Sequence, residues 1–357
     1  MTANDEHPIV LQDLQRIASA DLPWEQLARK TVLVTGGAGF LGAYLVRALL
    51  WANQLHSLEL KLVCLTRKPA SAHLRLGAWR TDPALDVRSH DISLPLPTGW
   101  PAADCIIHCA SQASPKYYGV DPVGTLLANT VGTRHLLDFA VQQHAERFLF
   151  FSTGEVYGRP LDPAHAITEQ DYGYLDPMQV RSCYAESKRM GETMCAAWAH
   201  QHGLHASVVR PFHTYGPGMA LDDGRVFADF VADVVAQRDI VLKSDGLAQR
   251  PFCYVADASI GFLTVLLKGA PAQAYNVANP AAEVSMRELA HTLAGLMPER
   301  RVGVRLDAAH GQPATGAAYL QSPVQRACPS IDKVARLGWQ PTVSIADGFR
   351  RTIESYL

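Results

Sequence analysis

The chain has 357 residues, too many for one compact core of ordinary size, and its 48% hydrophobic and 18% charged residues are typical of a soluble globular protein. Its 32 basic and 34 acidic side chains give a formal net charge of −2, which excludes a general attraction to nucleic acid or anionic membranes but leaves room for a small anionic ligand. Seven scattered cysteines without a CxxC pair, acidic residues among the first thirty positions and no apolar run of about twenty residues predict a cytoplasmic protein without disulfides, metal site, signal peptide or membrane span.

The first predicted elements are two short amphipathic helices, at 9–19 and 24–29, which form an N-terminal extension over 1–29. From Thr31 onward, short apolar strands alternate with helical patterns. Strands are expected at 31–35, 60–65, 104–109, 147–152 and 205–210, and helices near 40–52, 123–144 and 181–202. Strands that are apolar on both sides and separated by helices indicate an α/β fold with a doubly wound parallel sheet of the Rossmann type. Such a sheet binds its ligands beyond the carboxyl ends of its strands.

The pattern loosens after residue 210. Turn-rich pieces alternate with helices near 224–237 and 285–296, and the chain is expected to return to the first layer near 252–267, where an apolar strand precedes a helix. The sequence therefore predicts a dinucleotide-binding domain and a smaller, discontinuous α/β substrate-binding domain. The first comprises 30–210 and 250–277, and the second comprises 211–249 and 278–357.

The stretch TGGAGFLG, from Thr35 to Gly42, lies between the first strand and a helix. Glycines at such a turn can bend the chain sharply, let the backbone approach a pyrophosphate and let the helix pack on the strand. The free N–H groups and the dipole at the helix N-terminus then receive the phosphate charge. Gly36, Gly39 and Gly42 fit this role better than that of a merely flexible turn, because a strand and a helix flank them. The sequence therefore predicts a bound dinucleotide.

The second strand ends in Thr66, Arg67 and Lys68. A site that prefers NAD usually places an acid here for the adenosine ribose, whereas an arginine can accept the 2′-phosphate of NADP. Thr66 cannot act as that acid, so the cofactor is expected to be NAD or NADP and the strand end favours NADP. The alternative is that these basic side chains are merely solvated. Asp91, further along the chain, is expected to lie beside the adenine.

A set of proton-transfer groups is predicted at the carboxyl edge of the sheet. Thr153 follows an apolar strand, and Glu155 lies just beyond it. Tyr184 and Lys188 are four residues apart, which places both on one face of a helix, about 6 Å apart along its axis. A phenol is a poor base at neutral pH, and moving its pKa from 10 to about 7 requires about 4 kcal/mol. A nearby ammonium and a nicotinamide cation can supply that preference for tyrosinate.

Tyr184 is therefore expected to take a proton from a sugar hydroxyl while hydride leaves for the nicotinamide, and Thr153 is expected to hold the same oxygen by a hydrogen bond. The alternative is an ordinary surface Tyr/Lys pair on an amphipathic helix. The glycine turn upstream and the hydroxyl at a strand end disfavour that alternative.

Several motifs together make the sequence resemble the extended short-chain dehydrogenase/reductase family, whose NAD-dependent nucleotide-sugar epimerases, dehydratases and decarboxylases are the nearest group. These motifs are TGGAGFLG, HCAS (108–111), NTVGT (129–133), FSTGEVYG (151–158), YAESK (184–188) and LGW-x-P (337–341). The resemblance covers nearly everything from residue 30 onward and is closest to the UDP-glucuronate decarboxylase-like branch, through SPKYYGVDP, RSCYAESKR and DDGRV. In that family a tightly held cofactor takes a hydride, a second step occurs at the activated carbon, and the hydride returns.

The resemblance implies roles for a larger set of residues. Thr153, Tyr184 and Lys188 are the expected redox residues, and Glu155 matches an acid/base glutamate that acts at C5 of the sugar, its alternative being a structural glutamate that caps a turn. The expected cofactor contacts are Gly36, Gly39, Phe40, Leu41, Gly42, Arg67, Asp91, Ile92, Ala110, Asn129, Tyr184, Lys188 and Pro211. The expected substrate contacts are Lys116, Arg181, His213, Arg225, Arg250 and Arg326. Of these, Arg225, Arg250 and Arg326 are expected to receive the diphosphate or the sugar, and their alternative is ordinary surface ion pairing.

Three positions depart from the pattern of the family. Gly154 stands where the dehydratases have an aspartic acid that protonates the leaving hydroxyl and where the decarboxylases have a serine. This argues against 4,6-dehydration and weakens decarboxylation. His213 stands where relatives usually have asparagine, and Gly218 where decarboxylases commonly have arginine. We therefore expect an altered substrate pocket around a preserved redox core.

The interpretation that these residues favour is an NAD(P)-dependent nucleotide-sugar epimerase that works through a transient keto-sugar. A UDP-glucuronate-type decarboxylase is the close alternative, and a 4,6-dehydratase is less favoured. A dinucleotide-sensing protein without turnover is least favoured, because it has no reason to keep Tyr184 and Lys188. By analogy with the family, a homodimer is expected through the helices near 123–144 and 181–202. Neither nucleic acid nor a membrane is an expected partner.

Overall fold

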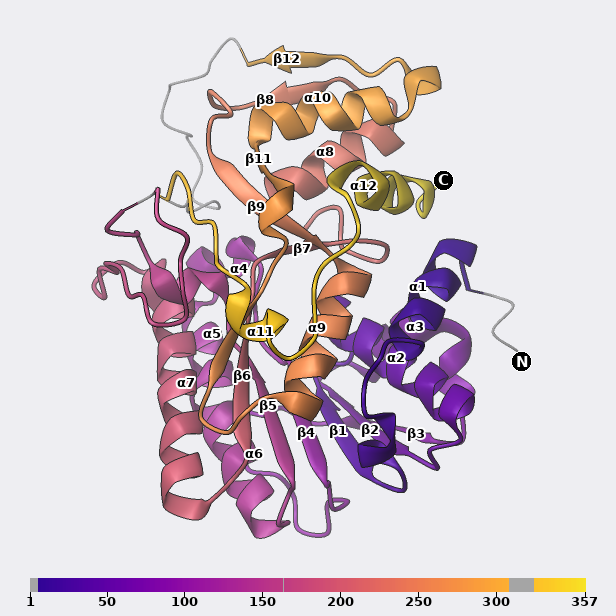
Figure 1. Ribbon diagram of the computed structural model, residues 1–357, viewed down its shortest axis with the longest axis vertical. Helices are drawn as coiled ribbons and strands as arrows, with labels where there is room; N and C mark the ends of the chain where they lie inside the picture. The colour runs from indigo at the N-terminus through magenta and orange to yellow at the C-terminus, as the bar shows by residue number, and fades with distance from the viewer. Residues whose placement is uncertain (1–5, 163, 308–323) are drawn as a thin grey trace.

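Seven parallel strands form the central sheet of the computed structural model, which describes residues 6–162, 164–307 and 324–357. Their order is β10-β6-β5-β4-β1-β2-β3 (Figure 1). The strands are β1 Thr31–Thr35, β2 Lys61–Thr66, β3 Leu85–Ser89, β4 Cys105–His108, β5 Arg147–Phe151, β6 Ala206–Pro211 and β10 Ala274–Val277. Because the strand order reverses between β1 and β4, ligands of this fold bind beyond the carboxyl ends of those two strands. The predicted Rossmann-type fold is confirmed.

Helices cover both faces of this sheet. Helices α2 (Phe40–His56) and α9 (Val255–Lys268) pack on one face, with α1 (Pro8–Ala18) outside them (Figure 1). Helices α6 (Val131–Gln142) and α7 (Ser182–His202) pack on the other face. Helix α7 comes so close to β5 that a Cβ on Gly191 would clash with the ring of Phe150. The shorter helices of this part of the chain are α3 Pro69–Leu76, α4 Pro115–Val120 and α5 Pro122–Asn129.

The chain after β6 builds a second, smaller group of elements, which we call the small lobe; the seven-stranded sheet and its helices are the large lobe. The small lobe contains a three-stranded sheet, in the order β11-β9-β7, and the strand pair β12-β8. Its strands are β7 His213–Tyr215, β8 Ile240–Leu242, β9 Gln249–Tyr254, β11 Glu283–Ser285 and β12 Val304–Leu306. Its helices are α8 Val226–Val235, α10 Met286–Leu296 and α12 Ile345–Glu354, while α11 Asp332–Ala335 lies beside β10. Figure 1 shows the small lobe above one end of the large sheet.

Several of the observed elements differ from the predicted ones. The helix expected near 123–144 is two helices, α5 and α6, with Thr130 between them at φ −113° and ψ −68°. The helix expected at 24–29 is only a 3₁₀ turn over Trp24–Leu27. The sequence pattern does not predict β3 and β10, which are the two edge strands of the large sheet. An edge strand is partly exposed and lacks a continuous apolar run, so its pattern is weak.

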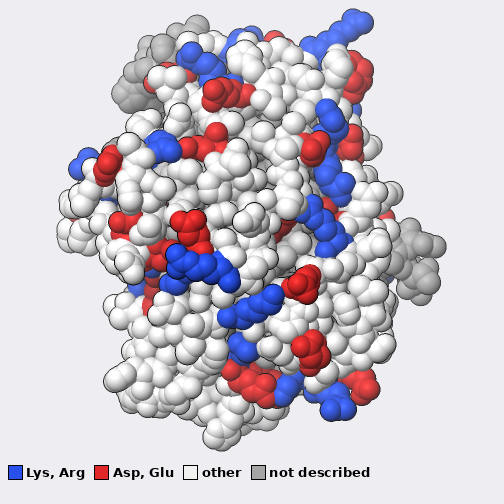
Figure 2. Space-filling model, in the orientation of Figure 1, with Lys and Arg blue, Asp and Glu red and all other residues white. Residues whose placement is uncertain are grey.

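Charged side chains of both signs lie on the surface of the protein. Figure 2 shows basic and acidic groups interspersed on the face that it draws. In the part of the chain that the structure describes, no helix is both long enough and apolar enough to cross a membrane. All seven cysteines are free thiols, and all but Cys109 are buried. Packing rather than covalent cross-links therefore holds the described elements together.

Candidate active site

The turn between β1 and α2 requires its glycines. Gly36 has a φ of +73°, and a Cβ there would lie 2.8 Å from the backbone N and Cα of Ala110, just after β4. A Cβ on Gly42 would clash with the carbonyl oxygen of Gly36, so α2 lies directly against the turn. Gly39 is the N-cap of α2 and brings no side chain to the first N–H groups of the helix. The N-terminus of α2 is thus bare peptide, which suits a phosphate group.

Three buried polar atoms near this turn have no hydrogen-bond partner within the described ranges. Ser111 Oγ and Gln112 Oε1 follow β4, and Asn129 Oδ1 lies at the end of α5. The side-chain amide of Asn129 donates to the hydroxyl of Ser187 at 3.0 Å, which ties it to α7. A buried polar atom that stays unpaired costs free energy, so such atoms suit a polar ligand. Together with the bare helix end, these residues fit a dinucleotide.

The end of β2 carries the second group of predicted cofactor residues. Arg67 is exposed, and its positive charge acts on both Asp91 and Asp121. Asp91 accepts hydrogen bonds from the backbone N–H and the hydroxyl of Ser93, at 2.9 and 2.8 Å. Burial alone raises the pKa of Asp91, but the bonds from Ser93 and the charge of Arg67 outweigh burial, and the pKa is lowered. Asp91 is therefore an anion at neutral pH beside the Arg67 cation.

The other predicted cofactor residues lie at the starts of helices and the ends of strands. Phe40 and Leu41 open α2, Ala110 follows β4, Ile92 is buried against Gly132 of α6, and Pro211 ends β6. All of them except Ile92 adjoin the carboxyl ends of parallel strands or the helix that follows β1. Their contacts with a cofactor stay predictions.

Tyr184 and Lys188 lie on the same buried face of α7, as the spacing predicts. Thr153 follows β5, and its side chain lies close enough to the phenol of Tyr184 to lower the pKa of that phenol as a hydrogen-bond donor. Burial raises the pKa of Tyr184 to about 12, and the negative charge of Glu155 adds to the rise, while the bond with Thr153 and the charge of Arg225 oppose it. The side chains of Thr153, just after β5, and Tyr184, on α7, are thus buried close to each other.

Lys188 does not lower the pKa of the phenol in the expected way. Its ammonium donates to the carbonyl oxygen of Phe151 at 2.7 Å and lies 6.0 Å from the centroid of the Tyr184 ring. Burial also lowers the pKa of Lys188 itself to about 7. Loss of hydration is the largest cause of both shifts, because both groups are buried. The groups of the protein alone therefore leave Tyr184 protonated and weaken the preference of Lys188 for its charged form.

Tyr118 is a site residue that the motifs did not single out. It lies on α4, is only 1% exposed, and stacks on Tyr184 with ring centroids 4.9 Å apart and planes 15° apart. Its hydroxyl donates to the carbonyl oxygen of Ala113 at 3.0 Å, and the guanidinium of Arg181 lies 6.0 Å from its ring. The two adjacent tyrosines of SPKYYGVDP were the available signal. Only the direction of α4 decides that Tyr118 faces the site and Tyr117 faces solvent.

Glu155 and Arg181 form an ion pair at the site. Arg181 Nη1 lies 3.0 Å from Glu155 Oε2, and the two side chains are 18% and 33% exposed. Glu155 lies in the 3₁₀ turn after β5, and Arg181 is the N-cap of α7. The charge of Glu155 raises the pKa of Tyr184, so the pair lies within electrostatic reach of the phenol. Such a pair can bind an anionic group through the guanidinium and transfer a proton through the carboxylate.

Gly154 has no room for a side chain while Phe212 keeps its place. A Cβ on Gly154 would lie 2.8 to 3.0 Å from three ring atoms of Phe212. Phe212 follows β6 and stacks on Tyr157 with ring centroids 6.1 Å apart. The ring of Phe212 thus occupies the space that a side chain at position 154 would need. The resemblance places the proton donor of a dehydratase at this position.

The predicted substrate residues His213, Arg225 and Lys116 lie around the start of the small lobe. His213 Nδ1 is buried without a hydrogen-bond partner among the described residues. Burial, followed by the charges of Arg250 and Arg225, holds the pKa of His213 well below its usual value, so the imidazole is neutral. Arg225 donates to the carbonyl oxygen of Ala113 at 3.3 Å, and Lys116 donates to that of Asp222 at 3.1 Å. The segment 113–116 of the large lobe is thereby tied to the segment 222–225.

Arg250 and Arg326, the other two predicted substrate residues, contact the small lobe and its connections. Arg250 donates to backbone carbonyl oxygens at the start of β9 and at 324–325. Arg326 pairs with Glu283 at 2.8 Å. Both guanidinium groups thus have protein partners, and their binding of a diphosphate stays a prediction.

Comparison with known proteins shows which family, which curated proteins and which solved structures this chain is similar to. The model of the NAD dependent epimerase/dehydratase family matches residues 32–278. UDP-glucuronic acid decarboxylase 6 of Arabidopsis thaliana is 36% identical over 318 residues, which are 89% of this chain and 86% of that protein. UDP-glucuronic acid decarboxylase 1 of Xenopus tropicalis is 32% identical over 352 residues, 97% of this chain and 77% of that protein. A solved dTDP-glucose 4,6-dehydratase of Streptomyces venezuelae, with NAD bound, matches with a TM-score of 0.76 at 27% identity, over 91% of this chain and 96% of that chain.

Gly36→Ala is expected to abolish retention of the dinucleotide, because alanine is strained at a φ of +73° and its Cβ would meet the backbone of Ala110. Chromatography of the nucleotides released by denaturing the purified protein measures this retention. Gly295→Ala in α10 is the matched control, because nothing lies within 4 Å of a Cβ there and alanine favours a helix. Equal retention by the two variants would contradict the role assigned to the turn.

Proposed function

The chain belongs to the NAD dependent epimerase/dehydratase family, and we propose that it is a nucleotide-sugar decarboxylase that converts UDP-glucuronate to a UDP-pentose and carbon dioxide. It is an enzyme of the extended short-chain dehydrogenase/reductase type. The observation that carries the proposal is the ion pair of Arg181 and Glu155 near Tyr184, which offers a carboxylate receptor and a proton-transfer group beside the redox residue. The names of the relatives at 36% and 32% identity support the choice of substrate.

This proposal differs from the epimerase that the sequence pattern favours. The lack of an arginine at position 218 argues against decarboxylation only if no other cation can bind the carboxylate of the substrate. Arg181 is such a cation: it adjoins Tyr118, which stacks on Tyr184. Its guanidinium can hold a carboxylate by two parallel hydrogen bonds. The decarboxylase therefore becomes the first choice.

The first half of the reaction makes a ketone at C4 of the sugar. When bound, NAD(P) would supply the hydride acceptor for this oxidation, the hydride source for the final reduction, and a positive charge that favours tyrosinate. Tyr184 takes the proton of the 4-hydroxyl group, and Thr153 hydrogen-bonds the same oxygen. Lys188 lies four residues along α7 and adds positive charge to the extent that it is protonated. Arg181 holds the carboxylate of the hexuronate meanwhile.

The second half breaks the bond between C5 and C6. The 4-keto-hexuronate is a β-keto acid, so C6 leaves as carbon dioxide and its bonding electrons move onto the C4 oxygen as an enolate. Hydroxyl groups of Thr153 and Tyr184 stabilise that oxygen by hydrogen bonds. A proton from solvent then reaches C5 through Glu155, the C4 carbonyl re-forms, and Tyr184 returns its proton when the ketone is reduced. The sum is the loss of carbon dioxide with uptake of one proton.

Epimerisation is the second candidate, and Gly218 is the observation that favours it. This position has a φ of +82°, carries no side chain, and its carbonyl oxygen accepts a hydrogen bond from Arg75 Nη1 at 2.6 Å. In an epimerase, Glu155 would remove and return a proton at C5 of the keto-sugar without loss of carbon. Dehydration is disfavoured because Phe212 fills the space where its general acid would stand. A dinucleotide-sensing protein without turnover does not need Thr153 and Tyr184 to be buried close to each other.

NADP is the cofactor that we propose, in preference to NAD. The end of β2 has no carboxylate for the adenosine ribose: Thr66 is buried, and its hydroxyl accepts a hydrogen bond from the backbone N–H of Lys68 at 3.2 Å. Arg67 is exposed at the same place, and its positive charge helps to lower the pKa of Asp91 and of Asp121. A guanidinium at this point suits a 2′-phosphate.

A homodimer in a reducing, cytoplasmic compartment is the setting that we propose. Exposed apolar side chains line the outer face of α5, at Val123, Leu126 and Leu127, and Met190 is exposed on α7. Helices α5 and α7 pack against each other, so these exposed apolar side chains lie on neighbouring helices. Exposed apolar side chains on neighbouring helices support association. The free thiols of all seven cysteines fit a reducing compartment.

With UDP-glucuronate in heavy water, the enzyme is expected to release one carbon dioxide per UDP-pentose, with deuterium at C5 of the product. Tyr184→Phe is expected to lower the turnover by about 10²- to 10⁴-fold, the usual contribution of a positioned acid–base group, without loss of cofactor. Mass spectrometry and NMR of the product measure both results. Tyr117→Phe is the matched control, because Tyr117 is the exposed neighbour of Tyr118 and its variant should keep full turnover.

Retention of all six sugar carbons with an inverted stereocentre would favour the epimerase instead. Turnover by Tyr184→Phe at the level of Tyr117→Phe would exclude both reactions as written, because each requires the phenol.

Nucleotides released by denaturation are expected to be NADP or NADPH rather than NAD or NADH. Thr66→Asp is expected to shift the retained cofactor toward NAD by about tenfold or more, which corresponds to about 1.4 kcal/mol, because a carboxylate binds the ribose hydroxyls and repels the 2′-phosphate. Lys61→Ala, at the other end of β2, is the control and should leave the ratio unchanged. NAD in the unaltered protein would overturn the preference for NADP.

Val123→Asp is expected to convert the dimer to a monomer, because two carboxylates would be buried in a self-complementary apolar face. Light scattering after size-exclusion chromatography measures the mass. Leu74→Asp places the same charge on the exposed surface of α3 and should leave the mass unchanged. A monomeric unaltered protein at micromolar concentration would refute the dimer.

A further inference from the structure

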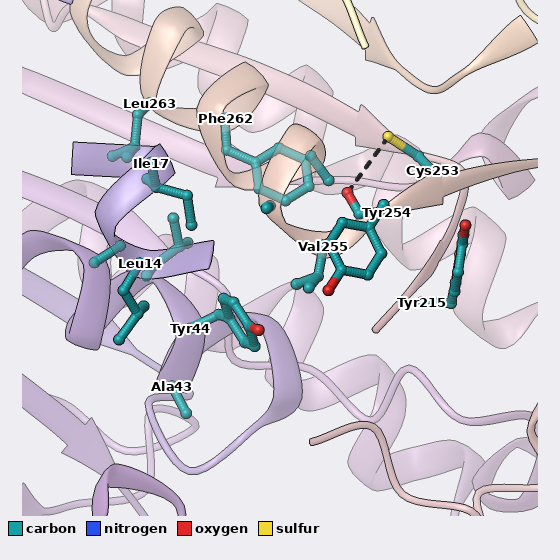
Figure 3. Packing of buried hydrophobic residues seen from close by; sticks show 14 of the residues in the cluster. Leu14, Ile17, Ala43, Tyr44, Tyr215, Cys253, Tyr254, Val255, Phe262 and Leu263 are labelled. Atoms are coloured by element: carbon teal, nitrogen blue, oxygen red, sulfur yellow. Dashed lines mark hydrogen bonds between the residues drawn. The ribbon is translucent and has the colours of Figure 1, made fainter. Parts of the chain in front are cut away.

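The helix α1 lies outside the residues 32–278 that the family model matches, yet it is built into the core. Leu14 and Ile17 are fully buried, and α1 packs against both α2 and α9. Figure 3 shows Leu14 and Ile17 near Tyr44 of α2 and Leu263 of α9. This apolar packing holds α1 on the large lobe. It does not explain the charged residue in the middle of the helix.

Asp13 is that residue, and its side chain is only 1% exposed. Its Oδ2 accepts hydrogen bonds from the hydroxyls of Tyr44, at 2.9 Å, and Tyr254, at 2.6 Å. Its Oδ1 accepts one from Arg351 Nη2 at 2.7 Å. Burial raises the pKa of Asp13 despite these donors, so the carboxylate is costly to bury and depends on them. The three donors come from α2, from β9 and from α12, which belong to both lobes.

Arg351 connects α12 to α1 through more than this ion pair. Its Nη1 donates to Gln12 Oε1 at 3.0 Å, its Nη2 to the carbonyl oxygen of Ile9 at 3.1 Å, and its Nε to the hydroxyl of Tyr254 at 3.1 Å. An open pocket of about 340 Å³ lies beside these contacts and is lined by residues of α1 and of the segment 342–351. The contacts that Arg351 makes with α1 are all polar.

The donors of Asp13 lead to two sides of the candidate site. Tyr44 lies on α2, one turn from its start, and packs edge-to-face on Phe40, the first residue after the glycine turn. Tyr254 packs edge-to-face on Tyr215 with ring centroids 5.7 Å apart. Phe349 of α12 stacks on the other side of this group, 3.9 Å from the ring of Tyr215. Tyr215 ends β7, and β7 begins at His213.

We infer that Asp13 is a positioning residue: through Tyr44, Tyr254 and Arg351 it holds the cofactor side of the site, at the start of α2, in register with the substrate side, at β7. The N-terminal extension is thus part of the substrate-binding apparatus although it touches no substrate residue. Loss of the Asp13 charge leaves Arg351 without its counter-charge and frees α12 and β7 relative to α2. The consequence is weaker binding of the nucleotide sugar, with little effect on the chemical step.

Asp13→Asn tests the inference, because it keeps the shape of the side chain and removes its charge. The KM for the nucleotide sugar is expected to rise by about threefold or more, the low end of coupling within one polar network, while kcat changes by less than about twofold. Hydrogen exchange is expected to quicken over 213–225 in the enzyme without added sugar. The double variant Asp13→Asn/Arg351→Met is expected to show less than the product of the two single effects, since the unpaired charge is gone.

Ile17→Val is the matched control, because it removes one buried methylene from the same helix without touching Asp13. Its melting temperature should fall, but its KM and its hydrogen exchange over 213–225 should stay unchanged. If Asp13→Asn and Ile17→Val behave alike in both measurements, α1 only adds stability and the inference is overturned. The kinetic assay rests on the proposed function, but the hydrogen exchange does not. If the unaltered enzyme fails to turn over UDP-glucuronate, the proposed function fails and the exchange comparison still decides the role of Asp13.

Discussion

The close approach of Gly36 to Ala110 is the constraint on which the rest of the site depends. Two parallel strands end side by side, and the turn after β1 can lie on the backbone after β4 only because no Cβ stands between them. This contact directs the bare N-terminus of α2 toward the edge of the sheet where β5 delivers Thr153. A dinucleotide that uses the helix end for its phosphates therefore extends toward the redox residues.

Burial sets the protonation states at that edge. Loss of hydration raises the pKa of Tyr184 to about 12 and lowers that of Lys188 to about 7, so each group is held in its neutral form more strongly than in water. The resting protein thus avoids an uncompensated buried charge. In the proposed reaction, proton removal by Tyr184 draws on the positive charge of the bound cofactor, which couples the chemistry to the presence of cofactor. Because water is excluded from this edge, a hydrogen bond from Thr153 is stronger there than in water.

Both lobes contribute to the candidate site. The large lobe supplies the glycine turn, Thr153, Tyr184 and Lys188, to which the proposed oxidation and reduction are assigned. The proposed fate of the ketone is assigned to the pairing of Glu155 with Arg181, the ring of Phe212 beside Gly154, and the bare Gly218. Hydrogen bonds between the segments 113–116 and 222–225 join the two lobes at one place. The ion pair of Asp13 on α1 with Arg351 on α12 joins them at another. A change of reaction within such a fold needs few substitutions because the redox half stays intact.

The sequence by itself determined the parallel sheet, the glycine turn and the shared face of Tyr184 and Lys188, because each depends on residues that are close together in the chain. The sequence pattern did not predict the edge strands, because their apolar patterning is weak. It also did not predict the break at Thr130, because the apolar pattern continues across it. Only the tertiary structure decided that Tyr118 stacks on Tyr184 and that Phe212 fills the space beside Gly154. It also decided that Asp13 joins three elements. These contacts join residues far apart in sequence, and side-chain direction and close packing, which local spacing does not encode, select them.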